Sequence, residues 1–165
     1  MKRLWVGASL IAITALAAVS IFPIQQFLLW NRTDSAPKGL YWRSNSPLTQ
    51  HGWAVVSANA PAAKWISERG YLAPDWPIIK RIQGMTGDTI CRDGAKISVN
   101  QRHVADALAT DSMGQDLPNW QGCFTLKQGE IFLLNDHPRS LDGRYFGPTS
   151  IHDLDGSAHL LWQSE

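Results

Sequence analysis

A serine and a lysine in two short segments could together break an amide bond by nucleophilic attack. Residues 35–41 read SAPKGLY, so Ser35 lies in a loop shaped by proline and glycine, where its hydroxyl could face outward. Lys80 follows two isoleucines in residues 78–82, a run typical of a buried strand. Burial disfavours the ammonium form and lowers a lysine pKa towards neutrality, so the neutral amine could accept a hydroxyl proton. The two residue types therefore indicate acyl-transfer chemistry.

Each of these residues also has an ordinary structural interpretation. A serine beside proline and glycine is most often a turn residue, and a strand lysine most often reaches solvent along its apolar stem. A third segment, residues 135–147, reads NDHPRSLDGRYFG and follows an apolar run. So dense a polar loop is either a turn with internal ion pairing or the scaffold of an active site.

The elements that would position these residues are mostly short strands. Eight tryptophans, nine prolines and 13 glycines favour short strands and turns over long helices. Apolar runs bounded by glycine, proline or polar loops predict buried strands, and the segment 60–70 could hold one or two helical turns. The predicted strands are residues 52–57, 77–82 and 130–134, with a hairpin over 88–104 and a polar surface excursion over 105–122.

The N-terminal segment has the composition of a membrane span. Residues 4–22 are almost wholly apolar, and a helix of about 20 residues crosses a bilayer. Lys2 and Arg3 precede the span and would keep the N-terminus in the cytoplasm, with Trp30 near the opposite interface. The alternative is a cleaved secretory signal with a small-residue site near residues 15–18, but such apolar regions usually run only about 7–15 residues. We therefore expect an uncleaved anchor, with the rest of the chain outside the cytoplasm.

Charge and cysteine content narrow the function classes further. The formal charge is +1, with 15 basic and 14 acidic residues, which gives no broad positive field for nucleic acid. Cys91 and Cys123 could pair in an oxidising compartment or remain two buried thiols. The sequence contains no Cys-x-x-Cys and no His-Glu-x-x-His motif, so we expect neither a metal nor another cofactor.

Taken in order, the three segments resemble the sequence boxes of type I signal peptidases, most closely the TraF-type signal peptidases of conjugative plasmid transfer. In that family the nucleophile occurs as Ser-x-Pro-x-Gly-x-Tyr, as in residues 35–41 here. The base lies in Lys-Arg-x-x-Gly-x-x-Gly-Asp, as in residues 80–88. The third box ends Ser-x-Asp-x-Arg-Tyr-Phe-Gly, as in residues 140–147. The resemblance extends from the N-terminal segment to about Pro148.

The resemblance implies a role for each matching residue. Ser35 would be the nucleophile, Lys80 the general base, and Ser140 a partner that orients the lysine amine. Asp142 and Arg144 would pair to hold the third box against the strand of Lys80. The oxyanion would be met by the Ser35 backbone N–H, helped by the hydroxyl of Thr33.

One departure from the longer leader peptidases raises an alternative. Their third box usually opens Gly-Asp-Asn, whereas residues 135–138 here read Asn-Asp-His-Pro. Ser35 could then work with His137 and either Asp136 or Asp142 as a Ser-His-Asp triad. We favour Lys80 as the base because it occupies its own motif. The other histidines are scattered and are interpreted as surface or structural residues.

The resemblance also implies the architecture and location of the chain. We expect a mainly β fold, a signal-peptidase-like β-barrel domain with a Ser/Lys dyad, preceded by one N-terminal transmembrane helix. Residues 1–30 would be the anchor and 31–165 an extracytoplasmic serine peptidase domain, with a small insertion at about 93–124. The chain would be a single-pass protein of the bacterial inner membrane, in contact with its lipid, with the catalytic domain on the periplasmic side.

The function that the resemblance implies is maturation of a pilin precursor in conjugative transfer, with an acyl-enzyme resolved by water or, to cyclise the product, by a substrate amine. The first alternative is a general type I signal peptidase that removes leader peptides from exported preproteins. The second is an anchored envelope protein whose β domain only binds partners. We expect a membrane-inserted pilin or preprotein as substrate and no nucleic acid, and we assign no oligomeric state.

Overall fold

The computed structural model of the chain describes residues 13, 14 and 27–164. The predicted membrane span over residues 4–22 lies outside this part except for positions 13 and 14. Within the described residues, no helix has the length and apolar character needed to cross a membrane. Strand β1 (Leu28–Asn31) begins inside the segment 1–30 that was assigned to the anchor, so the β domain starts earlier than residue 31.

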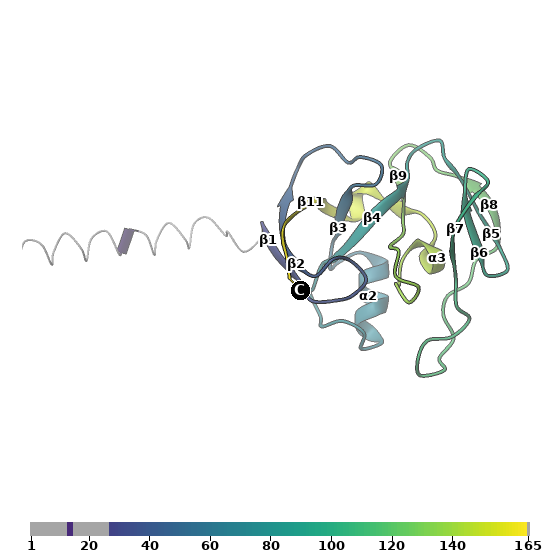
Figure 1. Ribbon diagram of the computed structural model, residues 1–165, viewed down its shortest axis with the longest axis horizontal. Helices are drawn as coiled ribbons and strands as arrows, with labels where there is room; N and C mark the ends of the chain where they lie inside the picture. Colours follow the sequence, from purple (N-terminus) through teal and green to yellow (C-terminus); the bar gives the residue numbers. More distant parts are fainter. Residues whose placement is uncertain (1–12, 15–26, 165) are drawn as a thin grey trace, which may run out of the picture.

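The expectation of a mainly β fold is confirmed, with the strands arranged in two sheets (Figure 1). The larger sheet has seven strands in the order β1-β2-β11-β3-β4-β9-β10, and its neighbours pair antiparallel. Besides β1 it contains β2 (Gly39–Ser44), β3 (Trp53–Val56), β4 (Ile78–Gly84), β9 (Glu130–Leu133), β10 (Thr149–Ser150) and β11 (Leu154–Gln163). The predicted strands over 52–57, 77–82 and 130–134 correspond to β3, β4 and β9.

The smaller sheet forms the opposite end of the molecule from β1 (Figure 1). Its order is β7-β6-β5-β8, and it begins before the predicted insertion at 93–124 because β5 belongs to it. Its strands are β5 (Thr89–Asp93), β6 (Lys96–Val99), β7 (Arg102–Asp106) and β8 (Gly122–Thr125). The polar excursion predicted over 105–122 connects β7 to β8.

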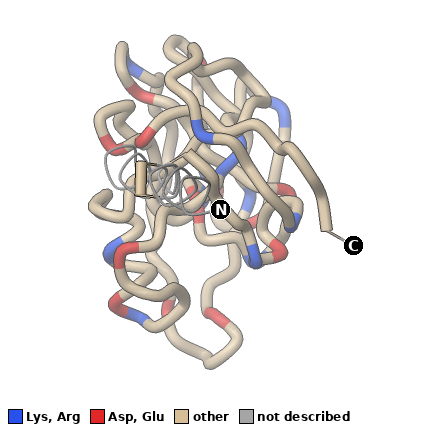
Figure 2. Tube along the Cα trace, turned by 90° about the vertical axis from the view of Figure 1, so that its left-hand side faces the viewer, with Lys and Arg blue, Asp and Glu red and all other residues tan. Residues whose placement is uncertain are grey.

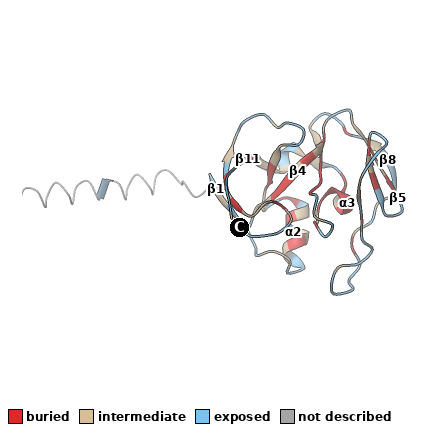
Figure 3. Cartoon of the chain, viewed as in Figure 1, coloured by how far each residue is buried: buried red, intermediate tan, exposed pale blue. Residues whose placement is uncertain are grey.

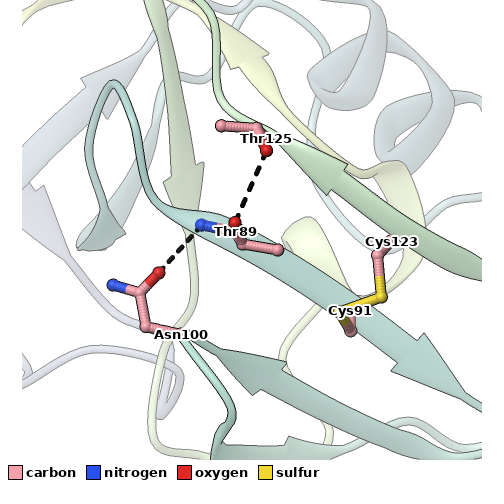
Figure 4. The surroundings of a disulfide bond; sticks show 5 residues. All are labelled: Thr89, Cys91, Asn100, Cys123 and Thr125. Atoms are coloured by element: carbon pink, nitrogen blue, oxygen red, sulfur yellow. Dashed lines mark hydrogen bonds between the residues drawn. A yellow bond between two sulfur atoms is a disulfide. The ribbon is translucent and has the colours of Figure 1, made fainter.

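A disulfide joins the two strands at one edge of the smaller sheet. Cys91 and Cys123 face each other in the β5–β8 ladder and are bonded (Figure 4). Two residues away, the Thr89 backbone N–H donates to Asn100 Oδ1 at 2.9 Å, and the Thr89 and Thr125 hydroxyls lie 3.4 Å apart. These contacts tie β5 to β8 and to the turn that follows β6.

Short helices fill the spaces beside the sheets. Helix α2 (Pro61–Glu68) starts at a proline, which is favoured in a first turn, and buries Ala63 and Ile66. The four-residue helix α3 (Gly143–Phe146) lies between the two sheets, and the 3-10 helix η2 (Ile151–Asp153) leads into β11.

Strand β4 runs through the interior of the domain, as the red segment in the middle of Figure 3 shows. On one side, Ile82 packs with Ala54 of β3 and Ala63 of α2. Phe132 of β9, the strand that pairs with β4, belongs to a second hydrophobic cluster, which includes residues of the smaller sheet. Lys80 and Ile82 alternate along β4 and are both buried, so the side chain of Lys80 is held away from water.

Apart from the buried Lys80, Arg92, Asp142 and Arg144, the charged residues in the described part of the chain are exposed or half-buried. Figure 2, a view from the side of β1, shows blue and red segments interspersed along the chain. The arrangement agrees with the nearly balanced composition of 15 basic and 14 acidic residues.

Candidate active site

Lys80 is a buried amine at the centre of β4. Only 4% of the residue is exposed, and Nζ donates a hydrogen bond to Ser140 Oγ at 2.9 Å. Burial lowers the pKa of Lys80 to about 8, against the negative charge of Asp142, which raises it, while Arg144 lowers it further. Near pH 7 about a tenth of this amine is therefore uncharged, far more than for an ordinary lysine, and the neutral form could act as a base.

The backbone on both sides of Lys80 is held by Asn135, a residue to which we assigned no role from the sequence. Asn135 Oδ1 accepts from the Arg81 N–H at 2.8 Å, and its Nδ2 donates to Ile79 O at 3.3 Å. Strand β9 ends at Leu133, so the asparagine side chain continues the β4 ladder past that end. The signal available in the sequence was a conspicuously polar amide directly after the apolar run 130–134.

The expected pairing of Asp142 with Arg144 is present and fully buried. Arg144 Nε lies 2.8 Å from Asp142 Oδ1, with side-chain exposures of 1% and 0%. Arg144 Nη2 also donates to Asn135 O at 2.6 Å, and Nη1 to Pro138 O at 3.1 Å. Asp142 Oδ2 in turn accepts from the Asn135 N–H at 3.0 Å. The pair therefore closes the loop that carries Asn135 and Ser140 to the two sides of Lys80.

Gly143 is required by this packing. A Cβ at this position would lie 2.6 Å from the ring of Phe132 and 2.7 Å from Leu133 O, too close for any side chain. The third box can thus dock against β9 only with a glycine between Asp142 and Arg144.

Ser35 lies in the loop between β1 and β2. Its Oγ is 3.1 Å from Thr33 Oγ1, and the buried Tyr41 hydroxyl fixes the loop by donating to Pro37 O at 2.7 Å. Gly39, at φ +147°, starts β2 where a Cβ would collide with Trp162 O of β11. The glycine and the tyrosine of residues 35–41 thus each have a structural reason.

Ser35, Thr33, Lys80 and Ser140 line one cleft of about 760 Å³. The structure thus brings together four of the residues singled out in the sequence, from the β1–β2 loop, β4 and the loop before α3. Among the described residues, no hydrogen bond joins Ser35 Oγ to Lys80 Nζ; the serine bonds to Thr33 and the lysine to Ser140. The walls include apolar side chains from β1, α2 and β4, such as Leu29, Ile66 and Ile79.

The side chain of the alternative base, His137, makes no hydrogen bond to a carboxylate among the described residues. Its Nδ1 accepts from the Arg139 N–H at 3.2 Å, which occupies the nitrogen that an aspartate would orient in a triad. The side chain of Asp136 is 88% exposed and lies 3.5 Å from Arg81, while Asp142 forms its ion pair with Arg144. His137 does share a neighbouring hollow with Ser35, but the hydrogen bonds of the described residues do not form a Ser-His-Asp chain.

The described residues contain no cluster of three or more histidine, cysteine, aspartate or glutamate side chains that could hold a metal ion.

Comparisons with known proteins agree with the motifs. The family model described as signal peptidase, peptidase S26, matches residues 2–163. A plasmid transfer protein TraF from Escherichia coli is 31% identical over 131 residues, covering 73% of this chain and 74% of its own. A second Escherichia coli TraF is 29% identical over 132 residues, covering 72% of each chain. Among solved structures, a signal peptidase I from Enterococcus faecalis V583 aligns with a TM-score of 0.40 and 18% identity, over 69% of this chain and 98% of that one.

Proposed function

This chain belongs to the S26 signal peptidase family, and on that premise we propose that it is a serine endopeptidase with Ser35 as nucleophile and Lys80 as general base. The observation that carries the proposal is the buried Lys80 amine, which has a lowered pKa, bonds to Ser140 and opens onto the same cleft as Ser35. A buried amine without a compensating carboxylate contact is costly, and catalysis gives a reason for it.

The proposed reaction begins when Ser35 exchanges its hydrogen bond to Thr33 for one to neutral Lys80. Serine Oγ then bonds to the carbonyl carbon of the substrate while its proton moves to Nζ. The resulting ammonium returns that proton to the leaving amine as the peptide bond breaks, which leaves an acyl ester on Ser35. Water or a substrate amine then attacks the ester carbonyl carbon and gives its proton to Lys80, which returns that proton to Ser35 Oγ as the ester bond breaks. Ser140 accepts a hydrogen bond from Nζ throughout and so keeps the amine aimed at the cleft.

Charge on the tetrahedral oxygen would be stabilised by two donors near Ser35. We assign these to the Ser35 backbone N–H and, once its present hydrogen bonds rearrange, the hydroxyl of Thr33. Removing one such donor typically costs two to three powers of ten in rate.

The likeness to two TraF proteins of plasmid transfer favours a pilin precursor of a conjugative system as the substrate. Purified enzyme and the precursor should be incubated together and the products weighed by mass spectrometry. We expect cleavage by the native chain and none by Ser35→Ala. A product heavier by one water than the cyclic form identifies hydrolysis, and the lighter one identifies cyclisation. If an exported preprotein is cut and the pilin precursor is not, the enzyme is a general signal peptidase.

The rate of cleavage should rise with pH through a midpoint near 8. The pKa of Lys80 is lowered to about 8, and only the neutral amine accepts a proton, so kcat/KM falls about tenfold for each pH unit below the midpoint. Because the unfolded lysine would keep its ordinary pKa of 10.5, the unfolded chain binds more protons between about pH 8 and 10.5. The contribution of Lys80 to the free energy of unfolding therefore also rises with pH in that window. A kcat/KM that is flat from about pH 6 to 9 would contradict the assignment.

An apolar surface beside the cleft supports a location at a membrane. The side chains of β1, β2 and β11 that form it are large and exposed, and two pairs of them stack. We call it the aromatic face; its residues are Phe27, Leu28, Trp30, Trp42, Leu161 and Trp162, which are 37–57% exposed. Because the apolar segment 4–22 ends shortly before this face, we propose that residues 1–30 include a transmembrane anchor in the bacterial inner membrane. The cleft then lies on the periplasmic side, near the lipid surface.

Replacing Leu161 and Trp162 together by serine tests the contact with lipid. Each side chain is more than half exposed, and neither lines the cleft. Loss of their insertion should reduce processing of a precursor held in the same vesicles by about tenfold, equivalent to about 1.4 kcal/mol. Cleavage of a short soluble peptide should not change. Met113→Ser, which removes a 63%-exposed side chain between β7 and β8, is the matched control. Equal losses on both substrates would argue against a membrane role.

A further inference from the structure

The side chain of Asn31, at the end of β1, is the centre of the loop that holds Ser35. Its Nδ2 donates to Thr33 O at 3.0 Å, Ala36 O at 2.9 Å and Pro37 O at 3.0 Å. Its Oδ1 accepts from the Thr33 N–H at 3.2 Å and from Thr33 Oγ1 at 2.9 Å. An amide has two hydrogens, so one of them is shared between two carbonyls. One side chain thus satisfies backbone groups on both sides of the serine.

These contacts fix which way the asparagine amide faces. Three carbonyl oxygens surround one end of the amide, and a backbone N–H points at the other end. In the flipped orientation, oxygen would face oxygen and an NH2 group would face an N–H, so only the present orientation makes hydrogen bonds.

The fixed amide in turn orders the two hydroxyls beyond it. Asn31 Oδ1 can only accept, so the hydroxyl hydrogen of Thr33 points at Asn31. Thr33 Oγ1 is then left as the acceptor for Ser35, 3.1 Å away, and the hydroxyl hydrogen of Ser35 points at Thr33. The order of donation therefore runs from Ser35 to Thr33 to Asn31.

We propose that Asn31 is a positioning residue for the nucleophile, acting through the hydroxyl of Thr33. The inference rests on the proposed function of Ser35. Asn31 holds the loop so that Ser35 Oγ lies at the cleft, and it keeps the Thr33 oxygen ready to take the serine hydrogen bond until Lys80 takes the proton. Without the amide, Ala36 O loses the Asn31 donor, Pro37 O keeps only the Tyr41 hydroxyl, and the hydroxyl hydrogens of Thr33 and Ser35 are no longer held in one direction. Small displacements of a reacting group can cost about a hundredfold in rate.

A double-mutant cycle, measured by kinetics on the full chain, separates positioning of the nucleophile from simple stabilisation of the loop. The variants are Asn31→Ala, Thr33→Val and the double variant. We expect Asn31→Ala to lower kcat for precursor cleavage by about 30-fold with KM changed less than about threefold, as for a group that positions the nucleophile. Because Asn31 acts on Ser35 partly through Thr33, the double variant should be clearly faster than the product of the two single losses predicts. The control is Asn59→Ala, an exposed loop asparagine whose own hydrogen bond uses its backbone N–H; it should retain the native kcat.

The inference is overturned if Asn31→Ala stays within twofold of the native kcat, or if the two single losses multiply in the double variant. Ser35→Ala in the same assay separates this failure from that of the proposed function. If Ser35→Ala still cleaves the precursor, the nucleophile itself is wrongly assigned; if it is inactive while Asn31→Ala is fully active, only the role of Asn31 is wrong.

A measurement on the native chain covers the case in which Asn31→Ala does not fold. The side-chain amide hydrogens of Asn31 are bonded to loop carbonyls, so in NMR spectra they should exchange with water at least tenfold more slowly than those of Asn59. In Thr33→Val their resonances should shift, because the hydroxyl that bonds Oδ1 is gone. Exchange as fast as that of Asn59, or unshifted resonances, would overturn the proposal.

Discussion

Replacing Lys80 by arginine is expected to lower kcat for precursor cleavage by about a thousandfold or more. A guanidinium stays protonated at every accessible pH, so it cannot take the proton of Ser35. Lys80→Met should be equally inactive, because its thioether cannot serve as the base, but it retains much of the apolar stem and removes a buried amine that burial penalises. Rates are measured with purified variants and a pilin precursor.

The two substitutions separate loss of chemistry from loss of folding. Lys80→Met should unfold at a denaturant concentration close to that of the native chain, and Lys64→Met, on the exposed side of α2, should keep full activity. A folded Lys80→Met variant with more than a tenth of the native kcat would show that another group is the base, and His137 would then be the first to examine.

The second large effect is expected on stability, from Arg144→Met. The substitution leaves Asp142 as an unpaired carboxylate in a site where its side chain is 0% exposed, and it removes the donors to Asn135 O and Pro138 O. Breaking a buried pair on one side typically costs about 3–5 kcal/mol. The free energy of unfolding in urea should fall by that amount, whereas Arg102→Met, an exposed change on β7, should alter it by less than about 0.5 kcal/mol.

A double substitution tests whether the loss of stability comes from the unpaired charge of Asp142. Asp142→Asn together with Arg144→Met removes both charges, so it should be less destabilising than the two single losses added together. Strict additivity would mean that the two residues stabilise the loop independently of each other.

The strands nearest Lys80 were predictable because their signal is local. Residues 52–57, 77–82 and 130–134 are short apolar runs with turn residues at their ends, and each is a strand in the interior of the larger sheet. Strand β11 was missed. It pairs with β2 and β3 in the middle of the same sheet, but it reads LDGSAHLLWQ, with a glycine and a polar start that hide any period of two.

The candidate site was predictable only in part, for a similar reason. Ser35, Lys80, Ser140 and the Asp142–Arg144 pair stand in motifs, and the motifs pointed to them. Asn31 and Asn135 do their work on backbone groups that come together only in the fold: loop carbonyls around Ser35 in one case, and the two neighbours of Lys80 in the other. Neither asparagine shows in the sequence which backbone groups its side chain will meet in the fold.

The most direct test of the Ser35–Lys80 mechanism is to trap the acyl-enzyme. The enzyme is mixed with precursor, quenched in acid within one turnover, digested and mapped by mass spectrometry. We predict that the peptide containing Ser35 gains the mass of the acyl fragment, that the adduct is lost on mild alkaline hydrolysis as an ester would be, and that Ser35→Ala and Lys80→Met show none. An adduct on any other residue, or unchanged adduct formation in Lys80→Met, would contradict the mechanism.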